Sequence, residues 1–180
     1  MTTELRSDLY PELRLSDEML LKELFAALTK SVDKLADPYS EDGSYVAAIN
    51  RLPIGLRSMA ATHHLDISLT MDDIGWHFLN FGEPGLVRAT EEGLRELGLP
   101  DMADWFNEAF GIVNPLKPKI SAADEYYDVL TQSGKMERID ELTDLASDKE
   151  PKVSGSPIYS AWVSYTRKYP ERVFGKRCTA

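Results

Sequence analysis

Apolar residues recur at spacings of three and four along most of the chain, which is the pattern of helices with one buried face. The clearest segment is 16–35, whose apolar face carries Leu21, Leu24, Phe25, Leu28, Val32 and Leu35. Ser16 predicts an N-cap for this helix, and Asp37-Pro38 predicts its end. No segment shows the alternation that is typical of a surface strand. The pattern therefore predicts an all-α protein with about seven to nine helices in a single compact domain.

Further helices are predicted from the same spacing and from residues that start or stop helices. Two capping boxes, Thr70 with Asp73 and Ser121 with Asp124, predict the first turns of two helices. Ser156-Pro157 predicts the start of a last helix that ends before Pro170. The remaining predicted helices lie near residues 44–51, 53–69, 86–97, 100–113 and 136–146. We expect residues 148–156 to form a flexible loop and residues 1–15 and 175–180 to be frayed.

The length of 180 residues predicts one domain over residues 1–180, and the net charge of −10 limits its partners. Acidity of this size disfavours direct binding to nucleic acid or to anionic membranes, but it permits a basic protein partner. Cys178 is the single cysteine, so no intramolecular disulfide is possible. The N-terminus has no signal-peptide pattern, and no stretch approaches the ~20 apolar residues of a membrane span. A cytoplasmic location is therefore the simplest expectation.

The charge is distributed unevenly along the chain. The first 150 residues carry a net charge of −15 and the last thirty carry +5. No Lys or Arg occurs in the stretches 58–87 and 96–116, so their carboxylates have no close basic partner in the sequence. We predict a partner-binding surface made by the carboxylates of Asp72, Asp73, Glu83, Glu92, Glu96, Asp101, Asp104 and Glu108. The alternative is a solvated helix face, paired in the fold with the basic tail.

Enzyme chemistry finds little support in the sequence. The phosphate-binding patterns GxGxxG and GxxxxGK[ST], the GxSxG elbow and the zinc motif HExxH are all missing. No cofactor and no catalytic residue is therefore assigned. One enzyme hypothesis remains, in which His64, Asp66 and His77, with Asp73, converge on a metal ion.

Three segments carry a resemblance to a known family. They are Arg-Leu-Pro-Ile-Gly-Leu-Arg at 51–57, Asp-Ile-Gly-Trp-His-Phe-Leu-Asn-Phe at 73–81, and Gly-Leu-Arg-Glu-Leu-Gly at 93–98. Together with the closing segment 159–174, they resemble the DMP19-like family, which is named for a bacterial DNA-mimic protein. The family-like core would span about 51–174. The motif positions are Asp73, Gly75, Trp76 and Phe78; the family usually has Asn-Gly-Gly-Phe where this chain has Asp-Ile-Gly-Trp at 73–76.

The resemblance implies an all-helical fold and an acidic, non-enzymatic protein-interaction module. In the sharpest form of this hypothesis, the chain is a DNA mimic that occupies a basic DNA-binding protein. One alternative is an immunity or antitoxin-like protein that neutralises a toxin. The other alternative is the metal-dependent enzyme described above. The sequence gives no expectation for the oligomeric state.

Overall fold

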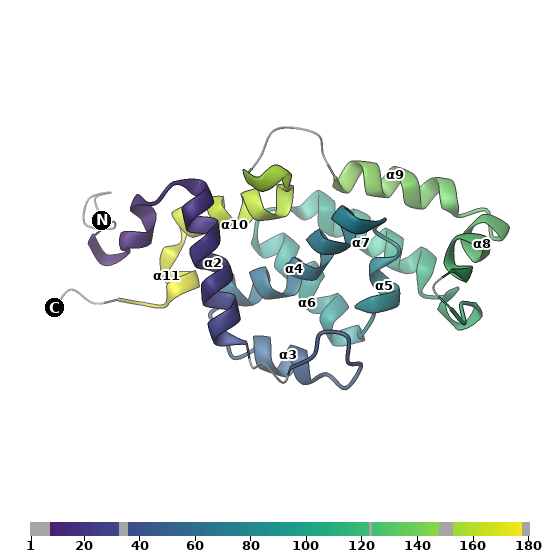
Figure 1. Ribbon diagram of the computed structural model, residues 1–180, viewed down its shortest axis with the longest axis horizontal. Helices are drawn as coiled ribbons and strands as arrows, with labels where there is room; N and C mark the ends of the chain where they lie inside the picture. Colours follow the sequence, from purple (N-terminus) through teal and green to yellow (C-terminus); the bar gives the residue numbers. More distant parts are fainter. Residues whose placement is uncertain (1–7, 33–35, 123, 148–152, 178–180) are drawn as a thin grey trace.

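A central helix, α4 (Ile54–Met71), is buried over most of its surface, and the other helices pack around it (Figure 1). The computed structural model describes residues 8–32, 36–122, 124–147 and 153–177. Small residues occupy several sides of α4, which lets neighbouring helices approach it closely. The hydroxyls of Ser58, Thr62 and Ser68 each donate to the carbonyl four residues earlier. This bonding gives the hydroxyl hydrogens of the three residues an acceptor within α4 itself.

The all-α prediction is confirmed, because the described residues form ten α-helices and no strand. The count exceeds seven to nine because two short helices, α5 and α11, are too brief to leave a periodic pattern. Among the described residues, no helix combines the length and apolarity needed to cross a bilayer. Besides α4, the elements are η1 (Pro11–Arg14), α2 (Asp17–Ser31), α3 (Ser44–Ile49), α5 (His77–Asn80), α6 (Pro84–Glu96), α7 (Pro100–Val113), η2 (Lys117–Lys119), α8 (Glu125–Gln132), α9 (Met136–Ala146), η3 (Val153–Gly155), α10 (Pro157–Lys168) and α11 (Pro170–Phe174).

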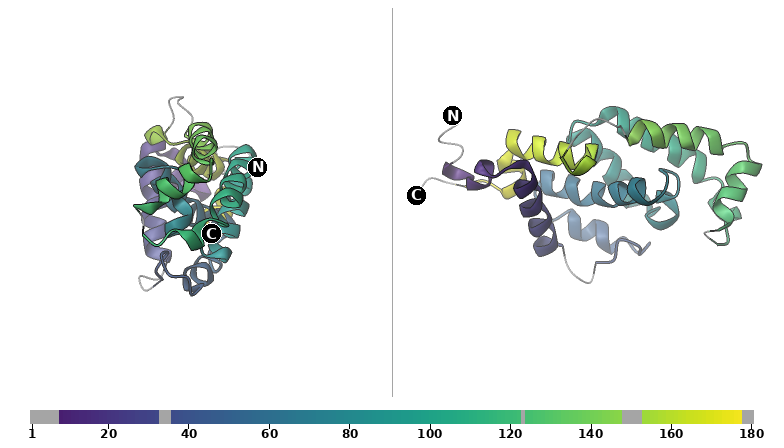
Figure 2. Two further views of the ribbon diagram at one scale, coloured as in Figure 1. Left: turned by 90° about the vertical axis from the view of Figure 1, so that its right-hand side faces the viewer. Right: turned by 45° about the horizontal axis from the view of Figure 1, so that its top comes forward.

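The protein is elongated, and its two ends are built from different parts of the chain. Helix α8 lies at one end of the long axis, whereas η1 and α11 lie at the other end (Figures 1 and 2). Helices α6, α10 and α11 pack against α4, and α7 packs against both α6 and α9. Helix α9 thus reaches the core through α7, and it extends the molecule towards α8.

The two chain ends pack against each other, so the expectation of frayed ends is wrong for residues 8–15 and 175–177. Tyr10 is only 3% exposed, and its hydroxyl donates to the carbonyl of Gly175 at 3.0 Å. Arg177 forms an ion pair with Glu12 at 2.7 Å. Residues 1–7 and 178–180, with Cys178, lie outside the described residues. Contacts between distant parts of the chain hold these ends, and local sequence patterns do not report such contacts.

The capping predictions are right at two helix starts and wrong at two others. Ser16 and Ser156 accept from the backbone N–H groups three residues later, as N-caps do. Thr70, however, lies inside α4, where its hydroxyl donates to the carbonyl of Asp66. The apolar run of α4 continues through Met71, so no new helix begins at Thr70. At Ser121, the backbone N–H donates to Glu125, and α8 begins without a side-chain cap.

The predicted loop 148–156 falls partly outside the described residues, which exclude 148–152. The remainder is ordered, because residues 153–155 form η3 and the Val153 N–H donates to the Ser160 hydroxyl at 2.8 Å. For these three residues the prediction of a flexible loop is wrong.

Candidate functional site

Exposed carboxylates gather on two helices that pack side by side, α7 and α9. We call this surface the acidic face and define it as the exposed acidic residues Asp101, Asp104, Glu108, Glu137, Asp140, Glu141 and Asp144. Asp101, Asp104 and Glu108 are three and four residues apart, so they share one side of α7. Three of these seven residues were predicted from the sequence. The four on α9 were not predicted, because α9 contains Arg138 and lies outside the two stretches without any Lys or Arg.

Two arginines neutralise part of the acidic face. Arg138 lies between the helices and pairs with Glu108 and with Glu141, each at 2.7 Å. The hydrogen bond from Arg138 holds the pKa of Glu108 below its usual value. Arg95 pairs with Asp104 at 2.7 Å and with Glu91 at 3.2 Å. The face nevertheless stays strongly negative, because seven carboxylates meet only these two cations among the described residues.

The basic C-terminal segment does not cover the acidic face. Arg167 pairs with Asp17, Arg172 with Glu96, and Arg177 with Glu12. The elements that hold Glu12, Asp17 and Arg172 are η1, α2 and α11, and they lie at the end of the molecule opposite α8 (Figure 1). The predicted pairing between the tail and acidic residues therefore occurs, but mainly with the N-terminal segment.

Five of the eight predicted carboxylates lie outside the acidic face. Asp72 accepts from the hydroxyl of Tyr127. Asp73 is 6% exposed and acts inside the fold. Glu83 caps α6, accepting from the Gly85 and Leu86 N–H groups at 2.9 and 2.7 Å. Glu96 pairs with Arg172, and Glu92 is exposed on α6.

The family-motif positions maintain the turn between α4 and α5. One oxygen of Asp73 accepts from the Trp76 N–H at 2.7 Å and from the Tyr126 hydroxyl at 2.8 Å. A Cβ on Gly75 would collide with that same hydroxyl. Phe78 is 1% exposed and packs against Phe106 with ring centroids 4.9 Å apart. Asp73 and Gly75 thus join α8 to the core, Phe78 is buried, and Trp76 is half-buried.

The residues of the metal hypothesis do not converge. His64 Nε2 contacts the Tyr45 hydroxyl at 3.2 Å, and His77 Nδ1 contacts the Ser68 hydroxyl at 2.9 Å. Asp66 accepts from the Ser156 hydroxyl. No group of three His, Cys, Asp or Glu side chains within the described ranges has a geometry that could hold a metal ion. The geometry therefore does not support an enzyme that uses these residues.

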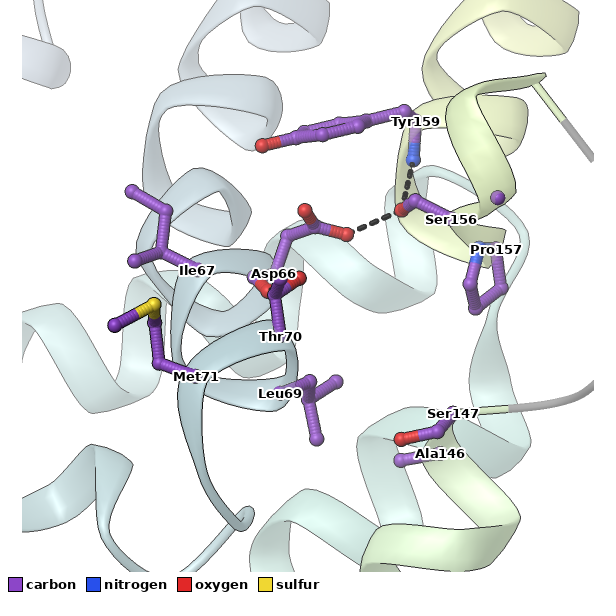
Figure 3. A pocket seen from close by; sticks show the side chains of 11 residues that line it. Asp66, Ile67, Leu69, Thr70, Met71, Ala146, Ser147, Ser156, Pro157 and Tyr159 are labelled. Carbon is purple, nitrogen blue, oxygen red and sulfur yellow. Dashed lines mark hydrogen bonds between the residues drawn. The ribbon is translucent and has the colours of Figure 1, made fainter.

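A pocket of about 390 Å³ lies beside the end of α9, and sequence reasoning did not predict it. It opens between the last turns of α4 and α9 and the start of α10, with Asp66 on its wall (Figure 3). Burial raises the pKa of Asp66, and hydrogen bonds from Ser156 and Tyr159 partly offset that effect. The 90 residues that separate Asp66 from Ser156 leave no local signal for this pairing.

Comparison with known families shows to which family this chain belongs. The model of the family described as DMP19-like protein matches residues 50–164, well over half of the chain. The chain belongs to the DMP19-like family. The predicted family membership is thus confirmed, although the predicted core 51–174 extends ten residues beyond the match. Comparisons with curated proteins and with solved structures gave no match.

The part of the chain that matches the DMP19-like family contains all residues of both candidate surfaces. The acidic face and the wall of the pocket up to Tyr159 fall within residues 50–164. Helix α11 and the N-terminal helices lie outside it. Arg167, Arg172 and Arg177 therefore lie beyond the DMP19-like match, whereas Glu96, the partner of Arg172, lies within it.

Proposed function

We propose that this protein is a non-enzymatic interaction module whose acidic face occupies the DNA-binding surface of a basic protein. The main support is the set of seven exposed carboxylates on the adjacent helices α7 and α9. Arg138 is the one basic residue on these two helices. Membership in the DMP19-like family, which is named for a DNA-mimic protein, supports the same proposal. An antitoxin would use a similar acidic surface to bind a toxin, and this alternative stays a prediction.

The spacing of the carboxylates supports mimicry of a nucleic-acid strand. Along α7, the steps from Asp101 to Asp104 and from Asp104 to Glu108 rise by about 4.5 and 6 Å. The phosphates of one DNA strand rise by about 3.4 Å per nucleotide, so each step spans between one and two phosphates. A cationic surface that binds a row of phosphates can therefore meet these carboxylates in turn.

The polarity of the molecule supports the same proposal. A basic partner is repelled by Lys and Arg side chains near its contact surface. Here Arg167 and Arg177 lie at the end of the protein opposite α8, where they pair with Asp17 and Glu12. These two arginines are thus neutralised away from the acidic face, whose own carboxylates pair with Arg95 and Arg138 among the described residues.

A displacement assay tests the proposal. Purified basic DNA-binding proteins are bound to a labelled duplex of about 20 base pairs, and the chain is added while fluorescence anisotropy is followed. We expect release of DNA from at least one of these proteins, and no release by an unrelated protein of equal net charge. Failure to displace DNA from any of them, or equal displacement by the unrelated protein, would contradict the proposal.

Matched charge reversals locate the contact. The test variant carries Asp101→Lys and Asp144→Lys on the acidic face, and the control carries Glu18→Lys and Glu23→Lys on α2. All four residues are exposed and form no ion pair within the described part of the chain. Both variants change the net charge equally. We expect at least a tenfold loss of displacement for the first and less than a threefold loss for the second.

A further inference from the structure

We propose that the pocket beside α9 receives the side chain of an arginine or lysine of the basic partner. This inference rests on the proposed function and adds a specific anchor to it. The pocket is lined by Asp66, Ile67, Leu69, Thr70, Met71, Ala146, Ser147, Gly155, Ser156, Pro157 and Tyr159. Its wall therefore combines one carboxylate with a largely apolar lining.

The charge inside the pocket suits a cation. Asp66 is 7% exposed, and none of the described Lys or Arg side chains forms an ion pair with it. Its hydrogen bonds come from hydroxyl groups, which carry no charge. A buried carboxylate is stabilised most by an opposite charge at short range. An incoming guanidinium or ammonium group would supply that charge.

The backbone around the pocket adds to this preference. Residues 67–71 form the last turn of α4, and Ala146 and Ser147 close α9. The C-terminal ends of two helices therefore border the pocket, and such ends carry partial negative charge. The start of α10 has the opposite polarity, but the Tyr159 N–H already donates to Ser156. Two of the three helix ends at the pocket thus carry the partial charge that attracts a cation.

The apolar walls suit the stem of a long basic side chain. Ile67 and Met71 lie on one side of Asp66, and Pro157 lies across from them (Figure 3). The ring of Tyr159 lies over the carboxylate, where it can stack on a guanidinium plane. Lys and Arg bury their methylene stems along apolar surface while the charged head reaches a polar group. A single Lys or Arg side chain can therefore contact the apolar lining with its stem and the carboxylate with its charged head.

The rim of the pocket identifies a macromolecule as the source of that side chain. Met71 is 75% exposed and Ile67 is 39% exposed, and both line the pocket. Leu145, 45% exposed, immediately precedes Ala146 on the wall. These are three of the six exposed large hydrophobic residues in the described ranges. Asp144 of the acidic face lies next to Leu145, so one partner can cover the face and the rim together.

The experiment uses n-butylguanidinium as the probe and the uncharged n-butylurea as its isostere. Both are titrated into the isotopically labelled full chain while NMR shifts of the Thr70 and Met71 methyl groups are followed. We expect saturable shifts with n-butylguanidinium at roughly millimolar concentration. n-Butylurea should bind at least tenfold more weakly. Equal shifts with the two compounds would overturn the assignment of a cation site.

Two variants and one control test the site itself. Asp66→Asn removes the charge, and Thr70→Lys places a competing cation on an exposed wall residue without disturbing the core. Each should abolish saturable binding of n-butylguanidinium. Met19→Lys, at an exposed position of α2 away from the pocket, should leave binding unchanged. Retained binding in Thr70→Lys, with the fold intact by circular dichroism, would overturn the proposal.

Competition separates this inference from the proposed function. Reversal of Asp101 and Asp144 should weaken DNA displacement and leave n-butylguanidinium binding unchanged. A basic protein that is released in the displacement assay should compete with n-butylguanidinium for the wild-type pocket. Binding of the small cation that no such protein competes with would overturn the assignment to a partner side chain and would leave the proposed function standing.

Discussion

At the scale of single residues, Gly75 shows how tightly the turn before α5 is packed. Its missing Cβ leaves room for the Tyr126 hydroxyl, which donates to Asp73. Val113 lies 3.0 Å from the position that the Cβ would take. Backbone and side chains from three elements therefore meet at one small residue.

Gly75→Ala should lower the free energy of unfolding by about 1–3 kcal/mol, because the added methyl displaces Tyr126 and weakens its hydrogen bond. Gly111→Ala is the matched control. Gly111 lies in α7 with no atom within 4 Å of its Cβ position, so alanine should stabilise the protein by about 0.5–1 kcal/mol. Urea denaturation measures both effects. Equal stabilities of the two variants would contradict the packing argument.

His77 is a buried imidazole with a defined proton position. The Ser68 hydroxyl donates to the His64 carbonyl, so the hydrogen bond between Ser68 and His77 Nδ1 is donated by the imidazole. Nε2 is therefore the unprotonated nitrogen, and it has no partner. Phe78, Phe81 and Phe106 lie around the ring. Burial, with the nearby His64, lowers the pKa of His77 to about 3.

This histidine makes stability depend on pH. Below about pH 6.5 the unfolded chain binds a proton that the native His77 does not bind, so stability falls as the pH drops towards 3. Burial and His63 lower the pKa of His64 to about 4, which adds a loss of the same sign between about pH 6.5 and 4. In His77→Phe, the loss of stability between pH 8 and pH 5 should be roughly 2 kcal/mol smaller than in the wild type.

Urea unfolding at the two pH values measures this difference. Comparison within each variant cancels the effect of the substitution itself, because that effect is present at pH 8 as well. Burial raises the pKa values of Asp66 and Asp73, and this contributes the opposite slope in both proteins. An equal loss of stability in wild type and variant would contradict the assignment to His77.

At the scale of elements, Arg167 joins α10 to the N-terminal segment. Its guanidinium pairs with Asp17 and donates to the carbonyls of Leu13 and Leu15 at 3.0 and 2.9 Å. Arg167 thus provides a hydrogen-bond donor to carbonyls at the end of η1 and a charge partner to the first turn of α2. The planar fork of arginine suits this arrangement, and the point charge of lysine does not.

Arg167→Lys should therefore loosen residues 8–15 even though the charge is retained. We expect amide hydrogen exchange in this segment to become at least tenfold faster, while exchange in α7 and α9 stays as in the wild type. Lys30→Arg, at an exposed position of α2, is the control and should change neither region. Unchanged exchange of residues 8–15 in Arg167→Lys would show that other contacts hold the segment.

At the scale of the whole molecule, the distribution of charge is the feature on which the proposed function rests. The acidic face lies on α7 and α9, whereas Arg167 and Arg177 pair with Asp17 and Glu12 of the N-terminal segment. Electrostatic association of this kind depends on ionic strength, because salt screens exposed charges beyond a distance of about 10 Å at 0.1 M.

Displacement of DNA from the basic partner should accordingly be salt-sensitive. Raising the salt from 50 to 200 mM should weaken the complex of the chain with that partner at least tenfold, as measured by calorimetry without DNA. The variant with Asp101→Lys and Asp144→Lys should show a shallower dependence. A complex that is insensitive to salt would point to apolar contacts as its main source of affinity.

The sequence by itself determined the helical class, the boundaries of amphipathic helices such as α9, and the family. Periodicity and capping are local, so α2, with Ser16 at its start, is visible in the chain. Helix α4 is less well defined by pattern because it is buried on nearly all sides. The motif at 73–81 was sufficient to predict the family. Its role in joining α8 to the core could not be predicted from the sequence.

The tertiary structure alone decided which carboxylates remain available. Glu96 and Arg172 are distant in the chain, yet they pair at 2.7 Å, while Asp101 stays exposed. Asp66 and Ser156, 90 residues apart, form the polar wall of a pocket. Coulomb energy and hydrogen bonding depend on distance in space and on burial, neither of which follows from spacing along the chain. For this reason the acidic character was evident from the sequence, but the location of the acidic face was not.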